Sequence, residues 1–429
     1  MAIKPERMSE LPPERRQKLM TRSMSDISAI YDQVVGIVRD IEKNGDAVIL
    51  KHYSKHKSDI TPADLVVSPD EVAAAYRDLD PAVIEALKKA KENIVRFHRA
   101  QLPKEMWSIE IAPGILAGRM TRPMDSAGCY VPGGRALYPS SVLMTILPAK
   151  VAGVKRVIAC TPPGPGMTAG AATIVAADLA EADMILKIGG PWAIAAMAFG
   201  TEVVPKVDKI VGPGNIYVTA AKMAVFGHVD IDSPAGPSES LIIADAGTNP
   251  QFAAIDFLSQ VEHDPDAAAI LVTDSLKIAQ QVCDIIDNEL PRLPRREIIE
   301  RAIEANSAVL VTNSLAESID VSNEYAPEHL QIMTADPFTV LPRIKHAGSI
   351  FLGENAPVPV GDYASGTNHV LPTGQCAKMF SGLSVDDFIK TPTFQYLSKD
   401  GLRSLKDTVI TLAEAEGLPI HARTIKERF

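Results

Sequence analysis

Four of the nine histidines in this 429-residue chain lie in unusually polar segments and are the first candidates for chemistry. One of them, His263, follows Gln260 by three positions, so a helix would place both side chains on one face. Imidazole nitrogen and amide oxygen can both bind a metal ion. The alternative is the polar end of a surface helix, and a Gln-x-x-His spacing alone does not separate the two.

The adjacent pair Glu328 and His329 is a second candidate. Pro327 precedes the pair and the apolar run 330–333 follows it, so we expect the pair at the edge of a strand, where catalytic groups often lie. A histidine near its ordinary pKa passes protons in both directions, and a neighbouring carboxylate can activate water. A solvated loop without chemistry is the alternative.

The other two histidines, His369 and His421, lie in segments of different character. His369 ends the segment 361–369, in which Asp362 lies among small residues that allow close approach of the backbone. A carboxylate oxygen is a good zinc ligand, so Asp362 is a metal candidate, whereas His369 either works in the site or anchors its loop. His421 lies near the C-terminus, where a histidine would ordinarily be incidental.

Alternating strands and helices must position these side chains. The first hundred residues are expected to be helical, with a capping box from Ser68 to Glu71 and another helix starting at Asp80-Pro81. From about residue 128, short apolar runs alternate with Ala-rich helical stretches and Gly/Pro-rich separators. This alternation predicts two α/β units with parallel sheets and helices on both faces. The charged helical segment after about residue 380 is too short for a core of its own and should pack on another domain or subunit.

The composition excludes several classes of protein. Hydrophobic residues make up 46% of the chain, which suits a folded protein of more than one domain. The formal net charge of −10 argues against nucleic-acid binding, which requires a clustered basic face. Four scattered cysteines without a CxxC pair favour a reducing compartment. With no recognisable signal peptide or membrane-length apolar run, we expect a cytoplasmic protein with no membrane or nucleic-acid partner.

The glycine-rich segments 212–215 (GPGN) and 235–240 (AGPSES) could present backbone N–H groups to a phosphate or a substrate. They could equally be tight turns. No G-x-G-x-x-G motif follows a predicted strand, so the usual dinucleotide fingerprint is missing. The residue patterns by themselves therefore indicate an α/β protein with a metal site and no more.

Nine segments, in order, resemble the histidinol dehydrogenase family. They are YVPGGRALYPSSVLM, PAKVAGV, FGTEVVPKVDKIVGPGNIYVTAAK, AGPSES, SQVEHDP, APEHL, GDYASGTNHVLPT, SVDDFIK and AEGLPIHA. The resemblance implies a homodimer of two Rossmann-like parallel-sheet domains, with a helical N-terminal region and a helical C-terminal arm that reaches into the partner. The first domain would comprise residues 1–126 and 239–380, the second residues 127–238, and the dimerisation arm residues 381–429.

The resemblance also assigns the zinc site and the chemistry. The zinc ligands would be Gln260, His263, Asp362 and His421, with His421 supplied by the other subunit. His329 would take the hydroxyl proton of a primary alcohol while a hydride passes to NAD, and Glu328 would activate water for addition to the bound aldehyde. A second oxidation would then yield the carboxylate. The expected substrate is L-histidinol, which would place the protein in histidine biosynthesis.

Further residues are assigned to the substrate and to NAD by the same resemblance. The substrate-binding set would be Ser238, Gln260, His263, His329, Asp362, His369, Glu416 and His421. The cofactor-binding set would be Tyr130, Trp192 and Asn215. Trp192 stands where the family commonly has glutamine, so its indole would either stack on the cofactor or occupy the cofactor's space. Thr391 stands where the family often has arginine.

Three other functions remain open at this stage. One is a family member that oxidises another small primary alcohol, such as a sulfonated or amino alcohol, since a sulfopropanediol dehydrogenase is similar to this family too. A second is a zinc hydrolase in which Glu328 or Glu262 activates a metal-bound water, which predicts turnover without NAD. A third is a zinc-dependent scaffold that oxidises no alcohol.

Overall fold

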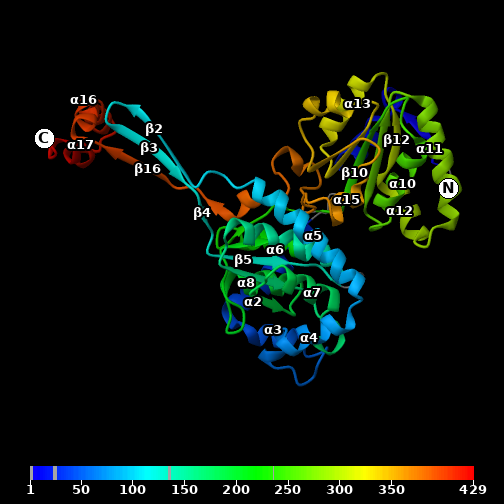
Figure 1. Ribbon diagram of the computed structural model, residues 1–429, viewed down its shortest axis with the longest axis horizontal. Helices are drawn as coiled ribbons and strands as arrows, with labels where there is room; N and C mark the ends of the chain where they lie inside the picture. Colours follow the sequence, from blue (N-terminus) through cyan, green and yellow to red (C-terminus); the bar gives the residue numbers. More distant parts are fainter. Residues whose placement is uncertain (1–2, 23–26, 134–136, 235) are drawn as a thin grey trace. The chain divides into compact units, whose positions relative to one another are not determined.

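The computed structural model describes residues 3–22, 27–133, 137–234 and 236–429. Residues 134–136 of the first family segment and Ala235 of AGPSES therefore lie outside the description. The described chain divides into two compact units (Figure 1). The larger unit comprises Met1–Gln101 and Asp125–Phe388, and the smaller comprises Leu102–Met124 and Ile389–Phe429. No helix within the described ranges is long and apolar enough to cross a membrane.

A parallel five-stranded sheet forms the first half of the larger unit. Its strand order is β7-β6-β5-β8-β9, with bounds β5 (Ser126–Tyr130), β6 (Arg156–Cys160), β7 (Met184–Leu186), β8 (Lys209–Val211) and β9 (Asp230–Ile231). The chain runs from β5 outward through β6 and β7, then returns to add β8 and β9 on the other side. The strand order therefore reverses between β5 and β8, and ligands commonly bind outside the carboxyl ends of strands at such a switch point.

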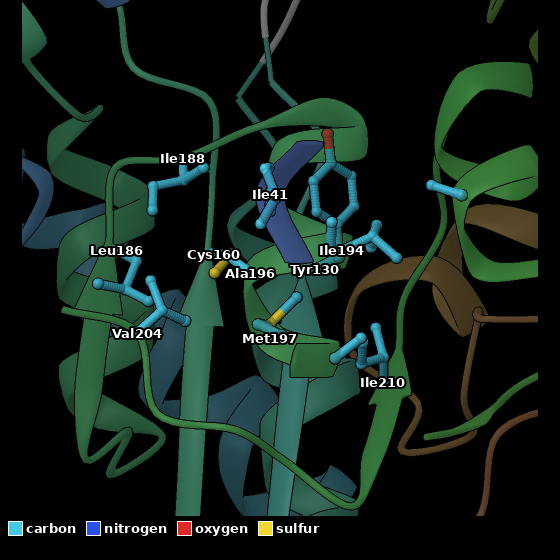
Figure 2. Close-up of a cluster of buried hydrophobic side chains, with 14 of the residues drawn as sticks. Ile41, Tyr130, Cys160, Leu186, Ile188, Ile194, Ala196, Met197, Val204 and Ile210 are labelled. Atoms are coloured by element: carbon cyan, nitrogen blue, oxygen red, sulfur yellow. The ribbon is translucent and has the colours of Figure 1, made fainter. Parts of the chain in front are cut away.

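Helices cover both faces of this sheet (Figure 1). The helices are α2 (Ser28–Asn44), α3 (Asp46–Tyr53), α4 (Pro69–Asp78), α5 (Pro81–Ala100), α6 (Pro139–Ala152), α7 (Ala171–Leu179), α8 (Gly190–Phe199) and α9 (Ile216–Val225). Helix α2 packs on α8 and α9, whereas α5 packs on α6 and α7. Figure 2 shows part of the core, in which Ile41 of α2 and Met197 of α8 lie beside side chains of the strands.

The helix starts that the sequence predicts in the N-terminal region are confirmed. Ser68 accepts a hydrogen bond from the Glu71 N–H, and the Glu71 carboxylate accepts one from the Ser68 N–H, so α4 begins with a capping box. Asp80 caps α5 by accepting from the Ala82 N–H at 2.8 Å. Such caps satisfy donors that the first helical turn leaves unpaired.

A second parallel sheet, of six strands, forms the other half of the larger unit. Its order is β1-β12-β11-β10-β13-β14, with bounds β1 (Pro5–Arg7), β10 (Glu239–Ala244), β11 (Ala268–Thr273), β12 (Ala308–Val311), β13 (His329–Met333) and β14 (Ser349–Leu352). Strands β10 to β13 are buried along their whole length, as expected when helices cover both faces of a parallel sheet. The strand order reverses between β10 and β13.

Alternate side chains of this sheet point into two different cores. Ile242 and Leu271 pack with α10 (Pro250–Val261), α11 (Leu276–Glu289) and α12 (Arg296–Asn306). Leu241 and Ile270 pack on the opposite face with α1 (Pro13–Thr21) and α13 (Leu315–Tyr325). The shorter helices α14 (Pro337–Val340) and α15 (Val358–Tyr363) lie along the chain on either side of β14. The predicted α/β class with two Rossmann-like parallel sheets is thus confirmed.

The smaller unit combines an antiparallel sheet with two helices. Strands β2 (Met106–Ala112), β3 (Ile115–Met120) and β16 (Thr393–Leu397) form the order β16-β3-β2, and β4 (Arg122–Pro123) pairs with β15 (Ile389–Lys390). Helices α16 (Lys399–Ala415) and α17 (Pro419–Lys426) pack on each other. The sequence predicts the helices here but not the strands. The domain limits expected from the sequence stay a prediction.

Candidate active site

A cleft of about 1380 Å³ in the larger unit is lined by residues from both parallel sheets. The five-stranded sheet contributes Pro132 after β5 and Pro213 to Asn215 after β8, at the carboxyl side of its switch point. The six-stranded sheet contributes Ser238, Glu328 and His329, at the amino ends of β10 and β13. The site therefore joins the carboxyl edge of one sheet to the amino edge of the other.

Glu328 is fixed on this edge by two hydrogen bonds. Its Oε2 accepts from the Ser238 hydroxyl and from the Glu239 N–H, each at 2.8 Å. The Ser238 oxygen in turn accepts from the Gln260 amide at 2.9 Å. The Glu328 side chain is almost completely buried. A carboxylate held in this way is well placed to receive a proton at its other oxygen.

The two ring nitrogens of His329, the first residue of β13, have different surroundings: one forms a hydrogen bond within the described part of the protein and the other does not. Its Nδ1 lies 3.2 Å from the main-chain oxygen of Glu239, and because a carbonyl only accepts, Nδ1 carries the hydrogen. Its Nε2 is buried, lies 3.5 Å from Asp362 Oδ1, and has no hydrogen-bond partner among the described residues. Nε2 is thus the ring nitrogen that a substrate hydroxyl can reach, and the one at which His329 can exchange a proton.

The carboxylates around His329 make its ring a strong proton acceptor. Burial acts to lower the pKa of His329, but Glu328 and Asp362 outweigh burial, and the pKa is raised well above its ordinary value. For Asp362, burial acts to raise the pKa, yet His329, His369 and His263 together lower it. Asp362 is therefore an ionised carboxylate close to three imidazoles.

His369 is held in place as a neutral ring. Its Nδ1 donates to the main-chain oxygen of Asp362 at 2.8 Å, and its Nε2 lies 3.0 Å from the hydroxyl of Ser141. Burial lowers the pKa of His369, despite the opposing effect of Asp362. Both alternatives drawn from the sequence are compatible with this position, because His369 lines the cleft and also anchors its own loop.

Of the four expected zinc ligands, His263 and Asp362 line this cleft, and the buried Gln260 lies behind it in contact with Ser238. Helix α10 ends at Val261, but Glu262 keeps helical backbone angles, so His263 lies on the tight turn that follows the buried Gln260. Amide, imidazole and carboxylate form an oxygen and nitrogen donor set of the kind that zinc accepts. Across the described ranges, His, Cys, Asp and Glu nowhere gather in threes in a geometry that would hold a metal by themselves.

Asn215 is the expected cofactor residue that lines the cleft. It caps α9, because its side chain accepts from the N–H groups of Tyr217 and Val218. The preceding turn is fixed through Gly212, whose N–H donates to Asp232 at 2.7 Å and whose carbonyl accepts from Lys222 at 3.1 Å. Lys222 and Asp232 form a buried ion pair beneath the turn.

Tyr130 and Trp192 contact the turn between β7 and α8. The Tyr130 hydroxyl accepts from the Gly190 N–H at 3.1 Å. The indole of Trp192 stacks on the ring of His52, with 3.6 Å between the ring centroids and an angle of 22°. The neighbouring Tyr53 hydroxyl accepts from the Gly189 N–H at 2.8 Å. Trp192 is thus engaged by a side chain of this chain, and the role of all three residues in cofactor binding stays a prediction.

Glu416 and His421 belong to the smaller unit. Glu416 is the residue at which α16 ends, and His421 lies in the first turns of α17. Both side chains are exposed. Their assignment to a site shared between subunits stays a prediction.

Comparison with known proteins identifies the family to which this chain belongs. The sequence model of the histidinol dehydrogenase family matches residues 20–429. The chain belongs to the histidinol dehydrogenase family. It is therefore an oxidoreductase of the alcohol dehydrogenase type that acts on a small molecule, and the resemblance noted in the sequence is confirmed.

Individual histidinol dehydrogenases match over nearly the whole chain. That of Methanothermobacter thermautotrophicus is 48% identical and that of Methanococcus maripaludis 52% identical, each over 98% of this chain and 99% of the relative. The crystal structure of histidinol dehydrogenase from Elizabethkingia anophelis has a TM-score of 0.94 at 39% identity, covering 99% of this chain and 98% of that one.

Two residues of this histidinol dehydrogenase family member support Glu328 and His329, although no sequence pattern singles them out. Glu239 binds Glu328 and His329, and Arg22 binds Glu239. The sequence holds a weak signal for Glu239, which is a charged residue at the start of a mostly apolar strand. It holds none for Arg22, which lies 217 positions from its partner.

Proposed function

We propose that the protein is a zinc-dependent, NAD-linked dehydrogenase that oxidises L-histidinol to L-histidine through an aldehyde that stays bound. The observation that carries the proposal is the position of His329. Its Nδ1 is committed to the Glu239 carbonyl, so the buried Nε2 beside Asp362 is the ring atom available to an alcohol. Nearly complete coverage by histidinol dehydrogenases supports histidinol as the substrate.

In the first oxidation, His329 removes the hydroxyl proton of the alcohol through Nε2. The imidazolium that forms is stabilised by Glu328 and Asp362, which each have an oxygen 3.5 Å from a ring nitrogen. NAD, when bound, would accept the hydride that leaves the carbon bearing this hydroxyl group. Proton and hydride together account for the two electrons and two hydrogens lost by the alcohol.

In the second oxidation, Glu328 removes a proton from water as the water oxygen bonds to the aldehyde carbon. Its hydrogen bonds from Ser238 and from the Glu239 N–H keep the carboxylate oriented during this step. The aldehyde oxygen takes the proton from the His329 imidazolium as water adds, which gives the hydrated aldehyde and restores His329 as a base. His329 then removes a hydroxyl proton from the hydrated aldehyde as the second hydride leaves to NAD, which gives the carboxylic acid. Holding both groups on adjacent residues keeps them within reach of one carbon.

Gln260, His263 and Asp362 would hold zinc, together with His421 of a second subunit. Zinc, when bound, would help to bind the substrate and orient it beside His329. Ser238 and His369 line the cleft on either side and would complete the substrate pocket with the arm residue Glu416. Tyr130, Trp192 and Asn215 would contact NAD around the switch point between β5 and β8.

A homodimer is supported by the surface of the smaller unit. Strand β2 is exposed on both faces, and Met106, Ile109 and Ile111 are among its exposed apolar side chains. Tyr396 on β16 and Ile420 on α17 are exposed as well. Large apolar side chains exposed in this number on one small unit suit a surface that another protein covers, and a second copy of this chain would cover them while its arm supplies His421.

The test is to count NADH formed per molecule of L-histidinol consumed by zinc-loaded protein. Two NADH per histidinol are expected, with L-histidine as product. Absence of NADH with histidinol but turnover of another small primary alcohol would replace the substrate and keep the chemistry. Turnover without NAD would instead favour a zinc hydrolase, and a zinc-bound protein that oxidises no alcohol on such a panel would be a scaffold.

A further inference from the structure

A buried arginine lies behind the acid–base pair and belongs to a distant part of the chain. Arg22 follows α1, and only 2% of its side chain is exposed. Its Nη2 donates to Glu239 Oε1 at 2.6 Å, while its Nε lies 2.5 Å from Oε2 of the same carboxylate. Only 4% of the Glu239 side chain is exposed. The Nη2 hydrogen bond fixes the direction of this buried ion pair, and the Nε contact adds charge attraction without a second hydrogen bond.

The same guanidinium also holds the segment that leads into Glu328. It lies over the ring of Tyr325, 3.5 Å from the ring centroid, and Nη2 donates to the Tyr325 carbonyl at 2.8 Å. The next residue, Ala326, has a φ of 50°, a left-handed conformation that a non-glycine residue adopts only when its surroundings hold it. Arg22 supplies part of that hold at the turn between α13 and β13.

Glu239 passes this restraint to both catalytic groups. Its carboxylate accepts from the Glu328 N–H at 3.3 Å, and its own N–H donates to the Glu328 carboxylate at 2.8 Å. Its carbonyl accepts from His329 Nδ1 at 3.2 Å. Three groups of one residue thus set the position of Glu328 and the tautomer of His329.

Arg22 is also the cation that keeps this buried carboxylate in place. Burial, together with Glu328, raises the pKa of Glu239 to about 7 against the opposing effect of Arg22. Removing a charged partner from a buried pair leaves an uncompensated charge, which must protonate or move. Either response would disturb the contacts of Glu239 with Glu328 and His329.

We propose that Arg22 is a positioning residue for the reaction, acting through Glu239 and the Tyr325 turn to hold Glu328 and His329 in their working geometry. The proposal rests on the function proposed above. A purely structural link between α1 and the six-stranded sheet would affect only the free energy of unfolding. A positioning role requires that the rate of the chemical steps depend on the guanidinium.

The test compares Arg22→Lys and Arg22→Gln with the matched pair Arg15→Lys and Arg15→Gln. Arg15 lies on α1, pairs with Glu6 at 3.0 Å and donates to the Ser307 carbonyl at 3.3 Å, so it also joins a carboxylate to a main-chain oxygen. Lysine keeps the charge at position 22 but cannot reach the carboxylate, the carbonyl and the ring together. Arg22→Lys therefore isolates geometry from charge, and remains informative if Arg22→Gln does not fold.

Steady-state rates well below each melting temperature are the first readout. We expect Arg22→Lys to lower kcat roughly tenfold to a hundredfold, with KM for histidinol and for NAD changed less than threefold, because small misplacements of catalytic groups have effects of this size. The Arg15 variants should keep the wild-type kcat. A wild-type kcat in Arg22→Lys, or a change confined to KM, would overturn the proposal.

Hydrogen exchange over residues 323–333 is the second readout and needs no substrate. Exchange should rise in Arg22→Lys and stay unchanged in Arg15→Lys. If wild-type protein forms no NADH from histidinol but exchange rises as expected, the proposed function fails and the positioning of the Glu328–His329 segment stands. If exchange in Arg22→Lys equals that of the wild type, the positioning role fails whatever the activity.

Discussion

At the scale of single residues, Glu328 and His329 have duties that can be separated by experiment. In the proposed mechanism His329 Nε2 serves both oxidations, whereas Glu328 is needed only where water adds to the aldehyde. The two side chains share a neighbour in Glu239 but contact it through different atoms. Replacing one need not displace the other, since the Glu239 carbonyl that orients His329 is independent of the Glu328 side chain.

Glu328→Gln should therefore abolish one direction of aldehyde chemistry and spare the other. Glutamine keeps the shape of the side chain but cannot take a proton from water, so oxidation of L-histidinal with NAD should fall by about 10²- to 10⁴-fold. Reduction of L-histidinal with NADH involves no addition of water, so it should lose only the stabilisation that Glu328 gives the His329 imidazolium and stay within about tenfold of the wild type. Following NADH absorbance in both directions measures the two effects. His329→Gln is the control and should lose both, and equal losses in Glu328→Gln would contradict the division of labour.

At the scale of elements, the two parallel sheets use opposite edges. The switch point of the five-stranded sheet opens on the cleft at the carboxyl ends of its strands, as the general rule for α/β sheets expects. In the six-stranded sheet the corresponding crevice is closed by its own side chains. Asp245 accepts from the Ala335 N–H at 2.8 Å, and Thr248 donates to the Met333 carbonyl at 2.6 Å. This sheet therefore contributes to the cleft from its amino edge.

Gly212 gives a test of the turn after β8. Its φ of 125° and its hydrogen bonds to Lys222 and Asp232 place its backbone against Tyr130, and an added Cβ would overlap the Tyr130 main-chain oxygen. Gly212→Ala should push this turn and Asn215 away from the switch point and weaken NADH binding roughly tenfold or more, the effect of about 1.4 kcal/mol. Fluorescence titration with NADH measures the affinity.

Gly227→Ala is the matched control for that experiment. Gly227 also has a positive φ, of 98°, but a Cβ there would meet nothing within 4 Å. Both variants carry backbone strain, of about 1–3 kcal/mol, and only Gly212→Ala adds a clash beside the cleft. If the two variants bind NADH equally well, the turn after β8 is not part of the cofactor site.

Much of this architecture could be predicted from the sequence, and the missing parts have a common cause. Alternation of apolar runs with helical stretches predicts the parallel sheets, since both signals are local. The pairing of β16 with β3 in the smaller unit was not predicted because the two strands lie far apart in the sequence. Local residue patterns led to Glu328, His329 and Asp362, and the family motifs assigned their roles, whereas the contact of Arg22 with Glu239 depends on the fold and on no local pattern.

At the scale of the whole molecule, the proposal that His421 completes the zinc site of a second subunit can be tested directly. His421 and Glu416 are exposed on a unit whose apolar strands are exposed too, and both facts suit an arm that is covered by a partner. His421→Ala should lower both zinc content and kcat, because one of four ligands is lost. Metal analysis after gel filtration measures the first effect, and full zinc retention would contradict the assignment of His421.

Mixing two variants, each with a defect in the site, distinguishes a site shared between subunits from a site built within one subunit. In a mixed dimer of His421→Ala and His329→Gln subunits, exchanged arms would give one site with both defects and one site with neither. Random reassembly makes about half of the dimers mixed, so about a quarter of the wild-type activity should return. If His421 served its own subunit, every site would carry one defect and no activity would return. The recovered fraction should also vary with the mixing ratio and peak at equal amounts, because only mixed dimers contain an intact site.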